Sequence, residues 1–241
     1  MYIAEKEDIH RLYPYEAEGE GWFGKECAKQ IIDGFFAKKK RKNIIMVQHT
    51  ESQHHVNGKV GAWGNWELTE RGKEQAFEIG RWLLKYECDP TFRMYVSDLT
   101  RAVQTAEGIN QSLHLNPIEM KIIREVSAGA GNGTDREWYN ANKIPQPMYY
   151  DPDYKPFDDA ESDRDLWNRL YPFYQEIIAS EEEKILIVSH GTSLSFLQSM
   201  LMGYSLKDIK NNRFIGDAGS ITKIIIEPNG KVIACYVNHR I

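Results

Sequence analysis

The chain has 241 residues, with 30 Lys plus Arg against 35 Asp plus Glu and a formal net charge of -5. This length is enough for one large domain with a substantial core, and the mild acidity argues against a dedicated binder of nucleic acid or of anionic membranes. The three cysteines, Cys27, Cys88 and Cys235, are widely separated and form no CxxC pair. Neither a disulfide framework nor a cysteine zinc site is therefore expected, and a reducing cytoplasm fits best.

Residues 1–43 are predicted to form an extension before the main domain. The opening stretch MYIAEKEDIHRLYPYEAEGE is acidic and lacks the apolar region of a secretory signal. No stretch of the chain approaches the roughly 18 apolar residues of a membrane span. Residues 24–43 favour one helix that ends in the basic run KKKRK. That run is either an anion-binding patch or, more simply, a cationic last turn that complements the helix dipole.

Strand and helix then alternate twice. The apolar run NIIMV (43–47) is typical of a strand covered on both faces. Residues 69–86, TERGKEQAFEIGRWLLKY, have a Thr at the N-cap and apolar side chains at helical spacing. FRMYVS (92–97) predicts a second strand and DLTRAVQTAEGINQSL (98–113) a second helix. This alternation indicates an α/β fold.

Residues 126–160 interrupt the alternation. They combine the loop-like SAGAGNG with four closely spaced prolines and six aromatic residues. Two interpretations remain open for this insertion. It is either an irregular segment held together by aromatic packing or a lid over a substrate site, because long loops of this kind are often functional.

The alternation resumes after the insertion. Residues 162–180 predict a helix with an apolar stripe and a kink at Pro172. KILIVSHG (184–191) predicts a second buried strand, followed by a helix over 192–203. Alternation around Asn229-Gly230 near the end of the chain is a strong hairpin signal.

The fold predicted for residues 44–241 is therefore a single α/β domain that carries the insertion 126–160. It has three layers, with a mainly parallel sheet, helices on both faces and an antiparallel C-terminal strand.

Two histidines occupy equivalent positions in this pattern. His49 and His190 each follow a buried strand directly, and Arg101 lies just beyond a third strand, at the start of a helix. Ligands of open α/β sheets bind beyond the carboxyl ends of the strands, so these side chains are expected to share one crevice. Free N–H groups of Gly191 and Thr192 at a helix N-terminus would add anion donors, which makes the site suited to a phosphoryl group.

Several ordered motifs make residues 43–240 resemble the histidine phosphatase superfamily, also called phosphoglycerate mutase-like. The family opens with a strand and Arg-His-Gly-Glu, then a LTxxGxxQA helix, and later has SxLxRAxQTA, an acidic residue after a short strand, a GESxxxLxxR helix start and strand-SHG. The matching stretches here are QHTES, LTERGKEQA (68–76), SDLTRAVQTA (97–106), IIREV with Glu125, AESDRDLWNR (160–169) and SHG (189–191).

The resemblance implies covalent phosphoryl transfer on a small phosphorylated metabolite. His49 would attack phosphorus and form a phosphohistidine. Arg101 and His190 would stabilise charge on the phosphoryl oxygens, and Glu125 would protonate the leaving oxygen and then activate water. Neither a metal nor another cofactor is needed for this scheme.

The chain departs from the family pattern beside His49. Gln48 replaces the family's first phosphate-binding Arg, and Thr50 replaces the usual Gly. Gln48 still donates a hydrogen bond, but a neutral bond contributes about 0.5–1.5 kcal/mol against about 1.5–3 for a charged one, and a deficit of about 1.4 kcal/mol is tenfold in rate or affinity. Three cations are candidates to replace the missing charge: Lys59, Arg71 and Arg136.

Two further features were weighed near His49. His54 and His55 lack a supporting carboxylate or cysteine pattern, so no metal site is expected with His49. Asn57 is a candidate for the family's phosphate-contacting Asn, although it lies further from His49 than that Asn does.

Three functions follow from these residues. The leading one is a phosphomonoesterase that acts through a phosphohistidine. The second is a phosphoglycerate mutase, against which the chain has EVSAGAGNG where the family's mutases have an ERHYG-like stretch. The third is a phosphate-ligand binding protein with little catalysis, which Gln48 suggests. Neither the identity of the substrate nor the oligomeric state can be predicted from this sequence.

Overall fold

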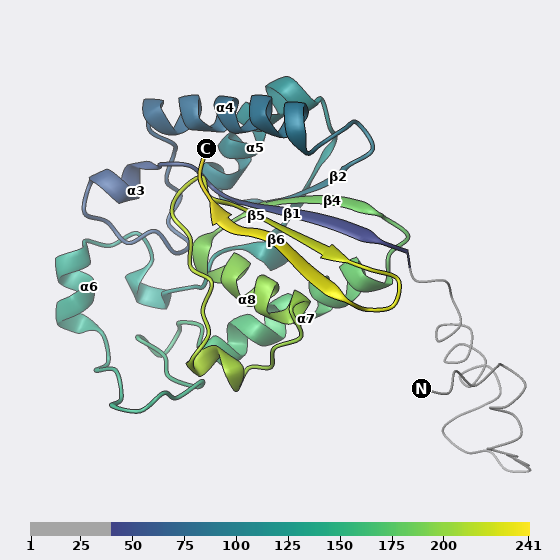
Figure 1. The fold of residues 1–241 in the computed structure, drawn as a ribbon. Helices are drawn as coiled ribbons and strands as arrows, with labels where there is room; N and C mark the ends of the chain where they lie inside the picture. The colour runs from purple at the N-terminus through teal and green to yellow at the C-terminus, as the bar shows by residue number, and fades with distance from the viewer. Residues whose placement is uncertain (1–39) are drawn as a thin grey trace, which may run out of the picture. The chain divides into compact units, whose positions relative to one another are not determined.

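The structure, a computed structural model, describes residues 40–241 (Figure 1). The helix predicted over 24–43 therefore lies mostly outside the described residues. Its last two residues do not continue a helix, because Lys42 and Asn43 begin strand β1. The boundary between the extension and the domain at residue 43 stays a prediction.

A six-stranded sheet forms the centre of the domain, in the order β3-β2-β4-β1-β5-β6. The first four of these strands are parallel, β5 is antiparallel to β1, and β6 is antiparallel to β5. The predicted mainly parallel sheet with antiparallel pairing at its C-terminal end is confirmed. Strand β3 was not predicted, since its four residues include a proline and alternate only weakly. The strands are β1 (Lys42–Gln48), β2 (Arg93–Ser97), β3 (Pro117–Met120), β4 (Lys184–Ser189), β5 (Ile221–Ile226) and β6 (Val232–His239).

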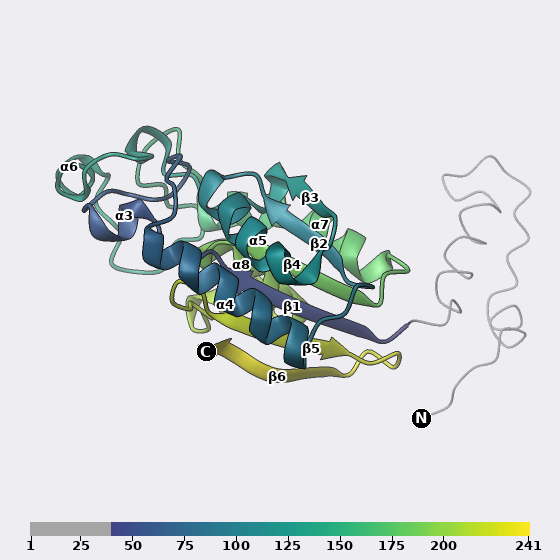
Figure 2. The same ribbon diagram turned by 90° about the horizontal axis from the view of Figure 1, so that it is seen from above.

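Helices cover both faces of the sheet (Figures 1 and 2). Helices α4 and α5 bury one apolar cluster against one face, and α7 and α8 bury another against the opposite face. The predicted three-layer arrangement is therefore confirmed. The helices are α3 (Gln53–Val56), α4 (Glu70–Tyr86), α5 (Thr100–Leu113), α6 (Arg136–Asn142), α7 (Asp163–Ala179) and α8 (Gly191–Leu201), with 3₁₀ turns at Lys121–Ile123, Gly129–Gly131 and Asp208–Lys210.

The register of the central strands places the two histidines side by side. Gln48 of β1 pairs with Ser189 of β4, so the next residues, His49 and His190, leave the sheet at the same level. The N–H of His49 donates to the carbonyl of Ser189 at 2.8 Å. The predicted shared crevice thus follows from parallel pairing in register.

The start of α4 holds the segment after His49. Thr69 caps the helix by accepting from the N–H of Gly72 at 3.0 Å. A side chain at Gly72 would have its Cβ only 1.9 Å from the carbonyl oxygen of Glu51, and the N–H of Glu51 donates to Gln75 at 3.1 Å. The motif LTERGKEQA therefore contacts the segment that leaves β1 and fixes its position.

The remaining sequence predictions can be compared directly with the structure. Helix α7 contains Pro172 and buries the predicted stripe. The final hairpin turns at Gly230, which has a φ of +81°, as expected for an Asn-Gly turn. Within residues 40–241, no helix combines the length and apolarity needed to cross a bilayer.

Candidate active site

Six of the eight predicted site residues line a cavity of about 570 Å³ at the carboxyl ends of β1, β2 and β4, whereas His190 and Asn57 are not part of its wall. Segments far apart in the sequence contribute to it: the turn after β1, the start of α5, the insertion and the start of α8. Its walls include Gln48, His49, His54, His55, Arg101, Glu125, Arg136, Tyr139, Gly191, Thr192 and Ile215.

His49 is held in one tautomer. Its Nδ1 lies 2.8 Å from the carbonyl oxygen of Thr50, which only accepts, so Nδ1 carries the proton. Its Nε2 accepts from the Nε of Arg101 at 3.1 Å. Burial, followed by the positive charge of Arg101, holds the pKa of His49 well below its usual range. The imidazole is therefore neutral, and its one unprotonated nitrogen, Nε2, is engaged by Arg101 in this structure.

Thr50, where the family has Gly, is accommodated by a second threonine. The N–H of Thr50 donates to Oγ1 of Thr105 at 3.1 Å, and the two hydroxyls lie 3.2 Å apart. Thr105 in turn donates to the carbonyl of Arg101 at 2.7 Å. The polar atoms of a fully buried Thr50 are thus satisfied.

Arg101 is 1% exposed and is anchored by its whole guanidinium. Nη1 donates to the carbonyl of Gly64 at 2.9 Å and Nη2 to that of Ala62 at 2.7 Å. Ala62 has a φ of 34°, a conformation that is costly for a residue with a Cβ. Burial lowers the pKa of Arg101 to about 10, so the side chain stays charged at neutral pH.

His190 lies beside His49, with 5.2 Å between ring centroids. Its Nε2 is 2.7 Å from Oγ of Ser97. Its Nδ1 is buried and has no hydrogen-bond partner among the residues that the structure describes. Burial is the main reason that the pKa of His190 is well below its usual range, with Arg101 the next cause. A ligand atom that reaches Nδ1 would satisfy this buried polar atom.

Glu125 caps helix α8, which corrects one prediction. Its Oε2 accepts from the N–H of Thr192 at 3.1 Å, and its Oε1 accepts from the N–H of Ser193 at 3.1 Å and from that of Val126 at 2.9 Å. The N–H of Thr192, expected to be free, is therefore engaged, because a carboxylate already occupies the positive end of this helix. Gly191 and Thr192 both line the cavity.

Arg169 fixes the backbone around Glu125. Its guanidinium donates to the carbonyls of Ile122, Arg124 and Glu125 at 2.7–3.0 Å and to the carboxylate of Glu161 at 2.6 and 2.8 Å. The motif AESDRDLWNR therefore positions the Glu125 segment rather than contacting the cavity through Arg169.

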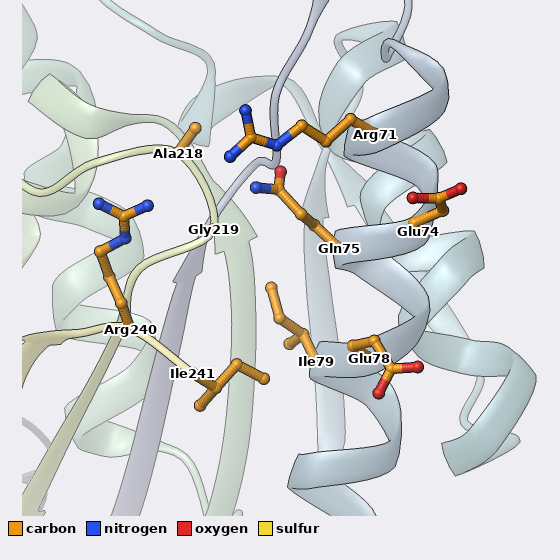
Figure 3. Close-up of a pocket in the computed structure, with 9 residues that line it drawn as sticks. All are labelled: Arg71, Glu74, Gln75, Glu78, Ile79, Ala218, Gly219, Arg240 and Ile241. Atoms are coloured by element: carbon orange, nitrogen blue, oxygen red, sulfur yellow. The ribbon is translucent and has the colours of Figure 1, made fainter.

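Of the three cations proposed to replace the missing Arg, one reaches the cavity. Arg136, from α6, lines it. Lys59 pairs with Asp135 at 2.7 Å and is not part of the wall. Arg71 lines a separate cavity of about 350 Å³ between α4 and the C-terminus, as Figure 3 shows.

Asn57 is not brought to the site either. It is exposed at the end of α3, where its Oδ1 accepts from the N–H of Lys59 at 3.1 Å. His55, two residues earlier, lines the cavity instead. The expectation that Asn57 contacts phosphate is therefore wrong in this structure, because the short helix α3 turns His55 inward and Asn57 outward.

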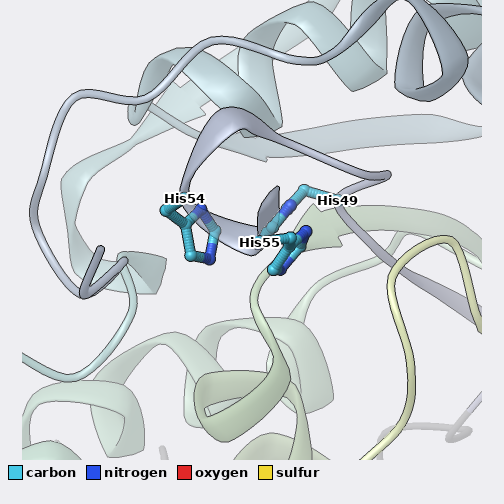
Figure 4. A group of neighbouring side chains, drawn as sticks. All are labelled: His49, His54 and His55. Carbon is cyan, nitrogen blue, oxygen red and sulfur yellow. The ribbon is translucent and has the colours of Figure 1, made fainter. Parts of the chain in front are cut away.

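His49, His54 and His55 form a cluster whose ligand nitrogens lie within 4.8 Å of one another (Figure 4). The hydrogen bonds oppose a metal there. Arg101 donates to His49 Nε2, and the N–H of Ser52 donates to His55 Nδ1 at 3.1 Å. A cation would have to displace a buried guanidinium from the nitrogen it needs. The cluster as arranged suits an anion better than a metal ion.

The buried histidines predict an acid-sensitive fold. The pKa of His54 falls from 6.5 to about 3, chiefly by burial and then by the charge of His55. Because the unfolded chain binds more protons than the folded one below pH 6.5, stability is full above that pH and is lost as the pH falls towards 3. The melting temperature is expected to drop between pH 7.5 and 5, and His54→Gln should flatten that drop.

The matched control is His114→Asn, an exposed helix C-cap at which Asn tolerates the φ of 52°. This control should keep the full pH dependence. A melting temperature that stays level or rises towards pH 5 in the wild type would contradict the neutral histidine cluster.

Comparison with known proteins bears on the same residues. The profile of the histidine phosphatase superfamily (branch 1) matches residues 44–239, most of the chain. The chain belongs to the histidine phosphatase superfamily. The resemblance inferred from the motifs is thereby confirmed, and membership makes the chain an enzyme of the histidine phosphatase and phosphoglycerate mutase-like class.

The names of the relatives and neighbours describe two kinds of activity. A 2,3-bisphosphoglycerate-dependent phosphoglycerate mutase of Porphyromonas gingivalis is 27% identical over 201 residues, covering 70% of this chain and 81% of the relative. A putative phosphoserine phosphatase 2 of Hydrogenobacter thermophilus is 26% identical, covering 82% and 95%. A mycobacterial glucosyl-3-phosphoglycerate phosphatase shares the fold at a TM-score of 0.69 and 20% identity, covering 83% and 100%.

Several residues that line or support the cavity were not predicted from the sequence to belong to a phosphate site. Ser97 and Thr105 lie inside the motif SDLTRAVQTA, so their motif positions were a usable signal. His55 and Tyr139 carry no such signal, because their places depend on the turn of α3 and on the packing of the insertion.

Proposed function

We propose that this histidine phosphatase hydrolyses a phosphomonoester through a phosphohistidine on His49. The observation that carries the proposal is the tautomer of His49, a cavity-lining residue whose Nε2 is unprotonated and attacks phosphorus once the phosphoryl group has taken over the hydrogen bond from Arg101. An imidazole in this state is a competent nucleophile towards phosphorus. The family provides the reaction class, and the roles of the individual residues are the proposal.

In the first step, Nε2 of His49 forms a bond to phosphorus while the bond from phosphorus to the alcohol oxygen breaks. Glu125 gives its proton to the departing alcohol. In the second step, water attacks phosphorus, the P–N bond breaks, and Glu125 takes the proton of the water.

Arg101 and His190 stabilise the phosphoryl oxygens in both steps. Arg101 uses three of its nitrogens in bonds to the protein, and its two remaining N–H groups are donors for phosphate. If the hydroxyl of Ser97 donates to Nε2 of His190, then Nδ1 carries the proton and donates to a phosphoryl oxygen. Such fixed donors supply most of the protein's contribution to phosphoryl transfer.

Arg136 supplies the charge that Gln48 lacks. It is the cation from the insertion that lines the cavity, and its positive charge contributes to the lowered pKa values of His54 and His55. Arg136→Gln is expected to lower kcat/KM about tenfold, the value of one charge-assisted bond, mainly through KM. Steady-state phosphate release measures this change.

Lys59→Gln is the matched control, since Lys59 pairs with Asp135, the residue before Arg136, but does not line the cavity. It should change kcat/KM little. Gln48→Arg combined with Arg136→Gln should restore binding. Equal losses for Lys59→Gln and Arg136→Gln would contradict a specific role of Arg136.

The acid role of Glu125 predicts a dependence on the leaving group. Glu125→Gln should slow alkyl phosphates about 10²-fold to 10⁴-fold. With 4-nitrophenyl phosphate, whose phenolate needs no proton, the first burst of nitrophenol should survive while the steady state slows. Stopped-flow absorbance and phosphate release separate these two steps.

Glu119→Gln, an exposed carboxylate on β3, is the control for that experiment. If Glu125→Gln slowed the burst equally for the alkyl and nitrophenyl esters, Glu125 would not be the general acid.

A phosphoglycerate mutase is the second candidate, and the mutase relatives favour it. Its phosphohistidine would return the phosphoryl group to a bound phosphoglycerate rather than to water. The test of the proposed function is phosphate release from a panel of phosphomonoesters, with and without bisphosphoglycerate. Release without priming supports the phosphatase, whereas isomerisation of phosphoglycerate that requires priming supports the mutase.

A further inference from the structure

A second cavity adjoins the one that contains His49. It has a volume of about 280 Å³, and Tyr139 and Thr192 line both cavities. Its walls come mainly from the insertion, with the start of α7 and the chain before β5. Tyrosines dominate these walls: Tyr139, Tyr149, Tyr150 and Tyr154.

Packing within the insertion fixes the tyrosine at the junction. Tyr139 meets the ring of Phe157 edge to face at 5.4 Å, and Trp138 stacks on the same ring at 5.8 Å. A Cβ at Gly131 would lie 2.6 Å from the Tyr139 ring, so glycine permits this close approach. Aromatic packing within the insertion thus builds a preformed wall of the site, whereas a lid function stays a prediction.

The charges of the second cavity oppose an anion. Three carboxylates line it, those of Asp151, Glu161 and Asp163, against one guanidinium, that of Arg213. Arg169 pairs with Glu161 from outside the wall, so Asp151 supplies the excess negative charge. Arg213 is already paired with Asp163, which also accepts from the hydroxyl of Tyr150 at 3.0 Å. A second phosphate or a carboxylate of the substrate would be repelled there.

We infer that the substrate is a phosphomonoester whose alcohol carries an uncharged ring system, and that this ring binds in the tyrosine-lined cavity. The inference rests on the proposed function, because it takes the phosphoryl group to lie at His49. Tyrosine rings offer apolar faces for stacking with hydroxyls at their edges. The phosphoryl group then meets Arg101 and Arg136, and the neutral part of the molecule passes Tyr139 into the second cavity.

The test compares alkyl phosphates with leaving alcohols of similar acidity. The probes are 2-(2-naphthyl)ethyl phosphate, n-propyl phosphate and the phosphate ester of 3-hydroxypropanoate. We expect kcat/KM for the naphthyl ester to exceed that for propyl phosphate at least about tenfold, with the carboxylate ester the poorest. Equal values for the naphthyl and propyl esters, or a preference for the carboxylate ester, would overturn the inference.

Variants of the cavity tyrosines test where the ring of the substrate binds. Tyr139→Ala and Tyr149→Ala should each reduce the naphthyl-to-propyl ratio roughly threefold to tenfold. Tyr149 is 80% exposed, so its replacement does not threaten the fold even if that of Tyr139 does. Tyr171→Ala, an exposed tyrosine of α7 outside both cavities, is the control and should leave the ratio unchanged.

The outcomes separate the two proposals. Absence of phosphate release from every ester would defeat the proposed function itself. Turnover of all esters with a ratio that Tyr139→Ala and Tyr149→Ala leave unchanged would defeat only the ring inference.

Discussion

Replacement of His49 by Ala is expected to lower kcat for phosphomonoesters at least roughly 10⁴-fold, the scale seen when a covalent nucleophile is removed. The reason is the arrangement of the imidazole, which lines the cavity, donates from Nδ1 to the carbonyl of Thr50 and leaves Nε2 unprotonated beside Arg101. No other described side chain combines this tautomer with this position beside Arg101. Steady-state phosphate release, with melting temperature as the check on folding, measures the effect.

His239→Ala is the matched control, since His239 is exposed at the end of β6. It should retain wild-type kcat. A His49→Ala protein that folds and keeps more than about a tenth of wild-type kcat would exclude His49 as the nucleophile.

The second large effect is expected at Arg101. Arg101→Lys should lower kcat about 10²-fold to 10³-fold, the cost of losing a fixed donor to the transition state. Lysine keeps the positive charge but lacks the branched guanidinium group, whose three nitrogens donate to His49, Gly64 and Ala62 at the same time. The half-buried carbonyls of Gly64 and Ala62 would then lose their donors, so the melting temperature should fall as well.

The stability and catalytic effects of Arg101→Lys can be separated. Saturating vanadate or phosphate should restore part of the melting temperature if the ligand still binds, without restoring kcat. Arg93→Lys, an exposed arginine on β2, should change neither quantity. Near-wild-type kcat in Arg101→Lys would show that the fork geometry is not needed for catalysis.

The sequence predicted best those elements whose local residue pattern matches their place in the fold. Strand β1 and helix α4 were predicted at nearly their observed bounds, because a buried parallel strand and a capped amphipathic helix each have a strong pattern. The convergence of His49 and His190 followed from the same reasoning, since parallel strands in register bring their carboxyl ends together.

The sequence was least informative where a side chain's direction depends on a short turn. Asn57 and His55 differ by two residues in a four-residue helix, and only the path of that helix decides which one faces the cavity. The prediction that the N–H of Thr192 is free was wrong for a related reason. Glu125 comes from 67 residues away to cap the helix, a contact with no local signature.

The location of the phosphoryl group during turnover distinguishes a nucleophilic His49 from every other mechanism. The wild-type enzyme would be mixed with a slowly hydrolysed phosphomonoester, quenched in alkaline denaturant, digested and analysed by fragmentation mass spectrometry. We expect the fragment ions to place a phosphohistidine at His49 and not at His54 or His55, which lie on the same peptide. Turnover without any phosphopeptide, or with the phosphoryl group on His54, His55 or His190 instead, would contradict this expectation.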